Sequence, residues 1–300
     1  MADSEEGNYT TLCLNRTHQK IVHSTVNSML ALIAFFGNVL IIVALQKVSS
    51  LHPPTKLLLG CLAVSDLCVG LITQPLHAAI LASPENSKIC FYLIVVFNIL
   101  GSIFMGVSLL TVTAIGVDRL LALLSGLRYR PVVTLTRAWI FVALIWLICL
   151  GVAIIFFFNY RIALSIICIE VLFCIVTSFL CYTKIYLTLR HHQVQIKETV
   201  HHGQTDVGRT PLNVERYKKT VSSPLWVQFV LAVCYVPFAI VTTIFVIKEM
   251  DTQLLERLLE VAISVVLLNS SLNPFLYCWK MKEVRQPMKV TIRQFWCFST

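Results

Sequence analysis

Several residues that can do chemistry lie inside long apolar stretches of this chain. Asp66 interrupts one stretch, Asp118 and Arg119 close the next, and Glu170 lies among isoleucine, valine and leucine in a later one. A charge at the centre of a bilayer costs at least about 2.5–3.5 kcal/mol on insertion scales, so such residues normally face the interior of a helix bundle and function there. The pattern predicts a membrane protein with an internal polar site.

Seven apolar stretches position these residues. Of the 300 residues, 57% are hydrophobic and 13% charged, against about 25% charged residues in a typical soluble domain. Each stretch can supply the ~20 residues that a transmembrane helix needs. The expected fold is an all-α membrane protein, a bundle of seven transmembrane helices with a short amphipathic helix at the C-terminus. The expected spans are 24–46, 57–82, 89–121, 135–158, 162–190, 218–247 and 255–279.

The expected domains follow from these spans and from the distribution of charge. Residues 1–23 form an extracellular tail, 24–279 the seven-helix domain, and 280–300 a cytosolic helix and tail on the membrane surface. Most lysines and arginines lie in the segments after spans one, three and five and in the C-terminal tail. Because basic segments stay in the cytosol, we expect a multi-pass plasma-membrane protein with its N-terminus outside. The net charge of +9 then reflects this topology and contact with anionic membrane lipids, and not binding of nucleic acid.

Residues outside the spans predict covalent modifications that fit this orientation. Asn8 and Asn15 each begin an Asn-x-Thr triplet, the acceptor for N-glycosylation. Of the eleven cysteines, only Cys13 and Cys90 are expected to meet an oxidising compartment, so a disulfide between them is a hypothesis. Cys297 in the basic tail is a candidate for palmitoylation, and an unmodified thiol is the alternative.

Short motifs follow one another along the spans. They are Gly37-Asn38, Leu62 to Asp66, Asp118-Arg119-Leu120, Trp146, Tyr182, Cys234-Tyr235-Val236-Pro237 and Asn273-Pro274-Phe275-Leu276-Tyr277. Each motif alone is a weak pattern, but in this order, each in its own span, they resemble the rhodopsin-like (class A) G-protein-coupled receptors over essentially the whole chain. The resemblance implies a non-enzymatic receptor that converts binding of an extracellular small molecule, lipid or peptide into activation of a heterotrimeric G protein.

The chain also departs from the usual pattern of that family. Tyr235 replaces a tryptophan, Leu120 a tyrosine and Cys174 a proline. Ile94 stands where most relatives have a disulfide cysteine, and the second outer loop near Asn159 is almost absent. The missing disulfide, missing proline and short loop resemble the melanocortin branch and its adenosine and cannabinoid neighbours.

The resemblance implies a sodium site around Asp66. Ser108, Asn269, Ser270 and Asn273 fall where the family gathers polar residues around this acid. Oxygen ligands around one carboxylate suit a hard cation. The alternative is a hydrated polar network with a protonated Asp66. No other metal and no organic cofactor is expected.

The resemblance also implies a set of residues that couple the helices to a G protein. In the family, the arginine at the position of Arg119 is released on activation and meets the G protein, and Asp118 is its expected local partner. Tyr217 occupies the position where many relatives have a locking acid, so raised basal activity is expected. Prolines in two spans predict kinks that act as hinges. The expected activation residues are Asp118, Arg119, Tyr182, Tyr235, Pro237, Pro274 and Tyr277.

A ligand pocket is expected in the outer half of the bundle, where the family binds small molecules. Glu170 either receives a cationic or hydrogen-bonding group of the ligand, or its protonated carboxyl is bonded to a neighbouring helix. Gly101 occupies the position of the aspartate of amine receptors, and Leu267 that of the retinal lysine, so monoamine binding in the usual mode and opsin function are disfavoured. The expected pocket residues are His77, Asn98, Gly101, Met105, Glu170, Phe238 and Glu260.

Two other functions compete with a ligand-activated receptor. The altered residues Tyr235 and Leu120 are compatible with a ligand-independent receptor that regulates through basal activity. Asp66 and Glu170 could instead be pathway charges of a transporter. A transporter should show an internal inverted repeat with broken helices in both halves, and the sequence has none.

Overall fold

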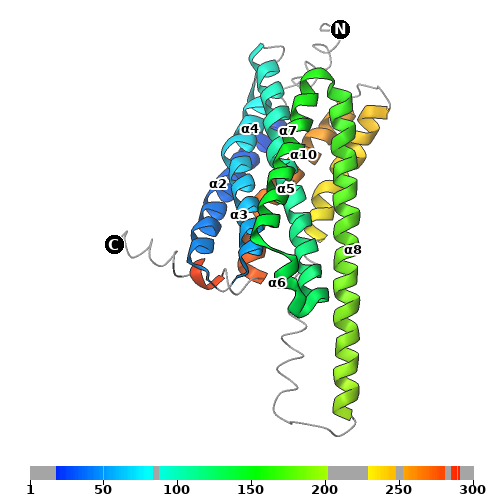
Figure 1. Cartoon of the computed structure of the whole chain (residues 1–300). Helices are drawn as coiled ribbons and strands as arrows, with labels where there is room; N and C mark the ends of the chain where they lie inside the picture. The colour runs from blue at the N-terminus through cyan, green and yellow to red at the C-terminus, as the bar shows by residue number, and fades with distance from the viewer. Residues whose placement is uncertain are drawn as a thin grey trace.

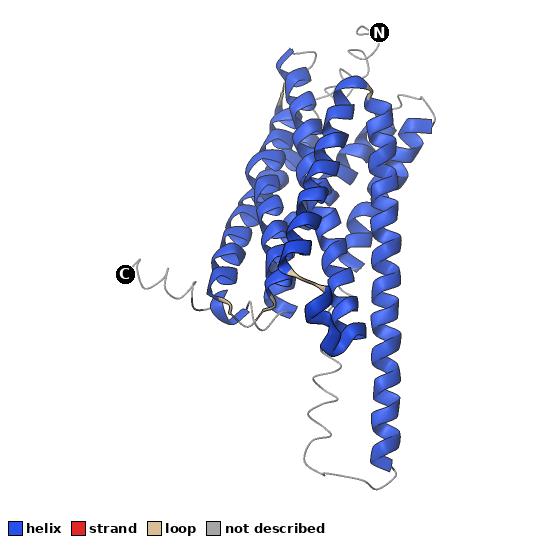
Figure 2. Cartoon of the chain, viewed as in Figure 1, coloured by secondary structure: helices blue, strands red, loops and turns tan. Residues whose placement is uncertain are grey.

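The computed structural model describes residues 18–49, 51–83, 88–201, 229–247, 253–280, 285–288 and 290. Every secondary-structure element in these ranges is a helix (Figure 2). The elements are α2 (His18–Lys47), α3 (Pro53–Cys68), the π-helix η2 (Val69–Thr73), α4 (Gln74–Ala82), α5 (Lys88–Ser125), the 3-10 helix η3 (Gly126–Arg128), α6 (Tyr129–Val132), α7 (Leu135–Phe158), α8 (Tyr160–His201), a helix over 229–247, and α10 (Gln253–Lys280).

Seven helices in the described part of the chain are long and apolar enough to cross a membrane. The elements α3, η2 and α4 are continuous and form one of these spans, Pro53–Ala82. The seven spans lie side by side as a bundle (Figure 1). The predicted all-α bundle of seven transmembrane helices is therefore confirmed. Most of the predicted C-terminal helix, 280–300, lies outside the described residues.

The helix ends differ from the predicted spans at two places. Helix α2 begins at His18, inside the stretch predicted as an extracellular tail, and α8 continues to His201, well into the predicted inner loop. The C-terminal part of α8 projects beyond the other helices (Figure 1). No glycine or proline occurs between Tyr160 and His201, so nothing in the local sequence breaks the helix where the apolar stretch ends.

A single residue separates α7 from α8, as the almost absent loop predicted. Asn159 adopts an extended backbone conformation after α7, and its Oδ1 accepts a hydrogen bond from the backbone N–H of Ile162 at 3.0 Å. An asparagine side chain that satisfies an N–H in the first turn is a favourable N-cap. Asn159 thus ends one helix and starts the next, which brings α7 and α8 together as an antiparallel pair.

The π-helical turn in the second span rotates the residues that follow it. The turn η2 precedes Gln74 and Pro75. Proline has no N–H and its ring clashes with the carbonyl four residues earlier, and a π-turn relieves that conflict by widening the helix locally. The rotation directs the fully buried Gln74 towards α10.

The bundle encloses a small number of polar residues within an apolar core, and its outer surface is apolar. Asp66 is 0% exposed, and Ser108 and Asn273 are almost as deeply buried, whereas the side chain of Phe158 is 81% exposed. An outer surface of large apolar side chains is stable only if lipid covers it. The arrangement explains why the sequence tolerates carboxylates within its most hydrophobic stretches.

The cysteines fall into two groups. Cys61, Cys68, Cys149, Cys168, Cys174, Cys181 and Cys234 are free thiols within the bundle. Cys90 is disulfide-bonded. Its predicted partner Cys13 lies outside the described residues, as do Asn8, Asn15 and Cys297, so these modifications remain predictions.

Candidate functional site

The most deeply buried acid forms a hydrogen-bonded cluster at the centre of the bundle. Ser108 Oγ on α5 donates to Asp66 Oδ1 at 2.7 Å, and Asn273 Nδ2 on α10 donates to Asp66 Oδ2 at 2.6 Å. The contacts join three helices whose residues are far apart in sequence. Hydrogen bonds to a charged group contribute about 1.5–3 kcal/mol each, so this cluster is a substantial restraint on the relative positions of the helices.

The other predicted members of the cluster are buried beside it. Ser270 lies within hydrogen-bonding reach of Asp66, and its backbone carbonyl accepts a hydrogen bond from Asn38 Nδ2 at 3.2 Å. Asn269 is 3% exposed, and its Nδ2 has no hydrogen-bond partner among the described residues. The structure therefore brings together Asp66, Ser108, Ser270 and Asn273. Asn269 is buried on the same helix as Asn273, but no hydrogen bond among the described residues joins it to Asp66.

The chemistry of this cluster fits a hard cation. The available ligands are carboxylate and hydroxyl oxygens, which sodium prefers to nitrogen or sulfur donors. Each oxygen of Asp66 accepts one hydrogen bond from the protein and has a second lone pair. The oxygens of Asp66, Ser108 and Ser270 would hold the ion. Sodium binding remains a prediction that these geometric facts allow.

A second carboxylate, Asp118, is hydrogen-bonded near the C-terminal end of α5. Thr55 Oγ1 donates to Asp118 Oδ2 at 2.9 Å, and the Tyr129 hydroxyl donates to Asp118 Oδ1 at 2.6 Å. Burial, followed by the hydrogen bond to Asp118, raises the pKa of Tyr129 to about 12. The hydroxyl therefore stays protonated at neutral pH and remains a donor.

The expected pairing of Arg119 with Asp118 is not found. Within the described ranges, the two side chains form no ion pair, because Asp118 is oriented towards the hydroxyls of Thr55 and Tyr129. Arg119 is partly buried, and Tyr182 lies against the same helix, with its hydroxyl oxygen 3.3 Å from where a Cβ on Gly116 would be. Tyr182 is 6% exposed and packs on an apolar cluster with Ile185 and Leu189.

The two prolines predicted as hinges are in different environments. Pro274 is buried within α10, and α2 approaches it closely at Gly37, where a Cβ would lie 2.7 Å from Pro274 Cγ. Pro237 in the 229–247 helix faces outward. Tyr235, two residues before Pro237, is 4% exposed and belongs to the core. The side chain of Tyr277 and the whole of Tyr217 lie outside the described residues.

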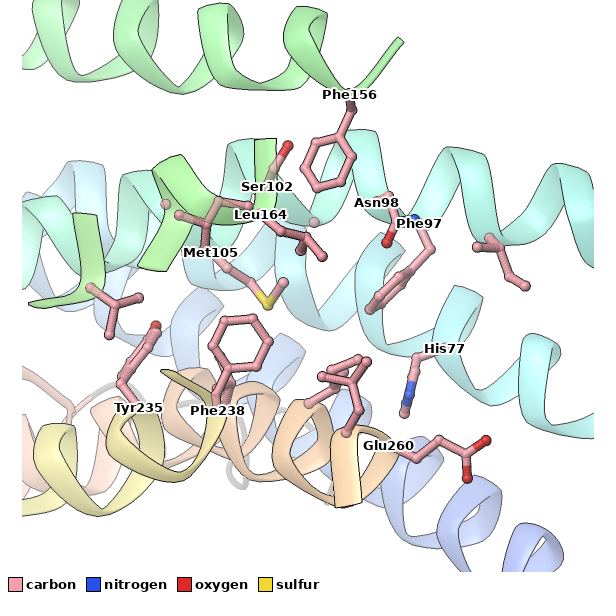
Figure 3. A pocket seen from close by; sticks show the side chains of 18 of the residues that line it. His77, Phe97, Asn98, Ser102, Met105, Phe156, Leu164, Tyr235, Phe238 and Glu260 are labelled. Atoms are coloured by element: carbon pink, nitrogen blue, oxygen red, sulfur yellow. The ribbon is translucent and has the colours of Figure 1, made fainter. Parts of the chain in front are cut away.

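A cavity lies near the end of the bundle where α7 meets α8, and all seven predicted pocket residues line it. Figure 3 shows Tyr235 towards one end of the cavity and His77 and Glu260 towards the other. Phe97, Met105 and Phe238 are among its apolar walls (Figure 3). The lining residues that the sequence predicted are His77, Asn98, Gly101, Met105, Glu170, Phe238 and Glu260. Their role as ligand contacts stays a prediction.

Sequence reasoning missed the contribution of α7 and part of α8 to this cavity. Leu164 and Ile167 line it together with Glu170, and their spacing of three residues places them on one helix face. Because Glu170 was predicted to face the interior, this spacing could have predicted that Leu164 and Ile167 face the interior too. Phe156 on α7 also lines the cavity, but it belongs to a uniformly apolar stretch that gives no signal of its orientation.

A polar seam between α2, α4 and α10 was also missed. Gln74 Nε2 donates to the Leu267 carbonyl at 3.1 Å and to Ser271 Oγ at 3.3 Å. Asn27 Nδ2 donates to Ser264 Oγ at 3.1 Å. The only sequence signal was the presence of amides in apolar spans, and buried amides are normally hydrogen-bonded across an interface.

The fold and these sites define a class of protein. Seven transmembrane helices enclose a cavity near one end, a buried acid cluster at the centre, and a held carboxylate next to an arginine at the other end. This combination is that of a seven-helix membrane receptor.

Comparison with known proteins agrees with this class. The family model described as "7 transmembrane receptor (rhodopsin family)" matches residues 37–163 and 157–277. The chain is 28% identical over 291 residues to adenosine receptor A3 of Ovis aries. The matched region covers 89% of this chain and 88% of that protein. The chain therefore belongs to the rhodopsin family of seven-transmembrane receptors. It is a multi-pass plasma-membrane signalling receptor and not an enzyme.

Proposed function

We propose that this receptor binds an extracellular ligand in the cavity and activates a heterotrimeric G protein on the cytosolic side, with its N-terminus outside. The observation that carries the proposal is the continuity of α5. This one helix contributes Asn98 and Met105 to the cavity, Ser108 to the central cluster, and Asp118 at its far end.

The length of α5 makes it suitable for transmitting a change across the membrane. From Asn98 to Arg119 it rises about 31 Å, at ~1.5 Å per residue, which is close to the thickness of the hydrocarbon core. A rotation or translation of α5 imposed by a ligand at Met105 must also move Ser108 and Asp118. Because a helix is much stiffer than a loop, the cavity and the opposite end are mechanically linked.

The central cluster supplies a two-state element for this transmission. Asp66 accepts one hydrogen bond from α5 and one from α10, while the buried Nδ2 of Asn269, also on α10, has no hydrogen-bond partner among the described residues. A second arrangement, in which Asn269 takes over a hydrogen bond, is therefore within reach. A ligand that binds one arrangement more tightly shifts the population towards it.

Sodium binding at Asp66 is part of this proposal. The ion would stabilise the arrangement in which Asp66, Ser108 and Ser270 are close together, and so oppose activation. Asp66→Asn removes the charge but keeps the size of the side chain. Agonist affinity, measured in sodium and in choline buffers, should depend on sodium in the wild-type receptor and not in Asp66→Asn. The same sodium dependence in both proteins would leave only a hydrated or purely structural cluster.

A ligand-independent receptor is the second candidate, and the missing ion pair of Arg119 favours it. Within the part of the chain that the structure describes, Arg119 forms no ion pair with an acidic side chain, so no such lock restrains it. Raised basal signalling should follow. Cells that express the receptor with a panel of chimeric G proteins, measured without ligand and with a ligand library, separate the two candidates. High activity that no ligand changes supports the second.

A further inference from the structure

The cavity has an unusual charge composition. Among the described residues, its lining includes two carboxylates, Glu170 and Glu260, and no lysine or arginine. The one basic side chain in this described lining is His77, which lies at the same end of the cavity as Glu260 and away from Tyr235 (Figure 3). The remaining walls are mostly apolar. A carboxylate in such a wall needs a positive or hydrogen-donating partner, because burying it without one costs several kcal/mol, typically about 2–7 for a polar group.

For one oxygen of Glu170, the described part of the chain supplies no such partner. Glu170 Oε1 is buried and accepts no hydrogen bond from any described residue. This contact pattern speaks against a carboxyl that is bonded to a neighbouring helix, the structural alternative for this residue. Natural proteins leave few buried polar atoms unsatisfied, and those that remain usually indicate function, bound water or an ion.

The neighbouring helices make room for this carboxyl. A Cβ on Gly106 of α5 would lie 3.3 Å from Glu170 Oε1 and 3.0 Å from Cys149 Sγ. Glycine at this position therefore allows the carboxyl of α8 to lie against the backbone of α5, within the wall of the cavity. The nearest side chain there, Cys149, offers only a weak S–H donor.

The size of the cavity limits the ligand that could satisfy Glu170. The cavity volume is about 110 Å³, somewhat less than the ~150 Å³ of an engineered cavity that binds benzene. The upper limit for such a space is a single ring with a short substituent. The apolar walls formed by Met105 and Phe238 suit the ring, and the substituent must carry the donor.

We propose that the cavity binds a small cationic ligand, with one ring and a protonated nitrogen, and that Glu170 on α8 is its counter-ion. This inference rests on the proposed function, because it assigns a ligand class to the same cavity. It differs from monoamine binding in the usual mode, since α5 offers Gly101 and no acid where an amine-binding aspartate would lie. The cation is held from α8 instead.

The test uses a matched pair of probes, phenethylamine and phenethyl alcohol, which differ only in the group that meets the carboxylate. Binding to purified receptor is measured by ligand-observed NMR titration, so that the result does not depend on G-protein coupling. The wild-type receptor should bind the amine at least about tenfold more tightly than the alcohol, or ~1.4 kcal/mol. In Glu170→Gln this preference should fall to within about twofold.

Glu260→Gln is the comparison variant, because it removes the other carboxylate of the cavity, and the preference for the amine should fall less in it than in Glu170→Gln. Glu170→Asp keeps the charge but withdraws it, and should give an intermediate preference. This variant carries the test if Glu170→Gln fails to fold, as judged by thermal unfolding. The proposal would be overturned if the wild-type receptor bound both probes equally or bound neither. It would also be overturned if Glu170→Gln kept the preference for the amine, or if Glu260→Gln lost that preference to the same extent as Glu170→Gln.

Discussion

Exchanging the acid and the amide at the centre of the bundle tests the cluster in its simplest form. Asn273 Nδ2 and Asp66 Oδ2 are 2.6 Å apart, so Asn273→Asp places a second carboxyl against the first. Two unit charges at that distance repel by about 6 kcal/mol at an effective dielectric constant of ~20. The protein avoids part of this cost by taking up a proton, and we expect Asn273→Asp to destabilise the receptor by about 3 kcal/mol.

The double variant Asp66→Asn/Asn273→Asp should recover most of that loss. The new amide at 66 can donate to the new carboxylate at 273 and still accept from Ser108, so every hydrogen bond of the cluster can form again. The expected coupling energy is about 1.5–3 kcal/mol, the range for a hydrogen bond to a charged group. Unfolding free energies of the purified wild type, both single variants and the double variant measure it. Single-variant costs that add to within ~0.5 kcal/mol would refute the direct contact.

Three further predictions concern the rest of the bundle. An epitope tag inserted between 191 and 216 should be detected only after cells are permeabilised, and detection on intact cells would contradict the orientation inferred from basic residues. Tyr129→Phe removes one of two hydrogen bonds to Asp118 and should raise basal nucleotide exchange and lower stability by about 1 kcal/mol; unchanged exchange would show that this contact does not restrain the receptor. Gly37→Ala should lower the unfolding free energy by about 1–3 kcal/mol, because its Cβ would lie 2.7 Å from a proline atom of α10. Gly60→Ala, with nothing within 4 Å, should be neutral or slightly stabilising, and equal effects of both would disprove the close approach.

The parts of the receptor that the sequence predicted are those where a chemical rule is strict. A carboxylate facing lipid is costly, so Asp66 and Glu170 were expected to point inward. This expectation determined which face of each of the two helices is directed towards the interior. Met105 and the other pocket residues were predicted from the resemblance to the receptor family, which binds small molecules at that depth of the bundle. The spans themselves followed from the length of the apolar stretches.

The parts that it did not predict depend on geometry that changes within one helical turn. The π-turn before Gln74 rotates that side chain onto α10, and no periodic pattern reports such a rotation. The pairing of Asp118 with Thr55 and Tyr129 was missed because Arg119 is the obvious partner in sequence. Adjacent residues on a helix point in directions about 100° apart, so the hydroxyls on α3 and α6 were better placed to reach the carboxylate.

The most direct test of the receptor as a signalling protein is nucleotide exchange with purified components. The receptor, reconstituted in lipid vesicles, is mixed with each class of heterotrimeric G protein, and GTP uptake by the α-subunit is followed over time. The proposal predicts faster exchange on at least one class, lost in Arg119→Ala, whereas Arg161→Ala at the α7–α8 end leaves it unchanged. Exchange at the rate of empty vesicles for every class, with and without ligands, would contradict it.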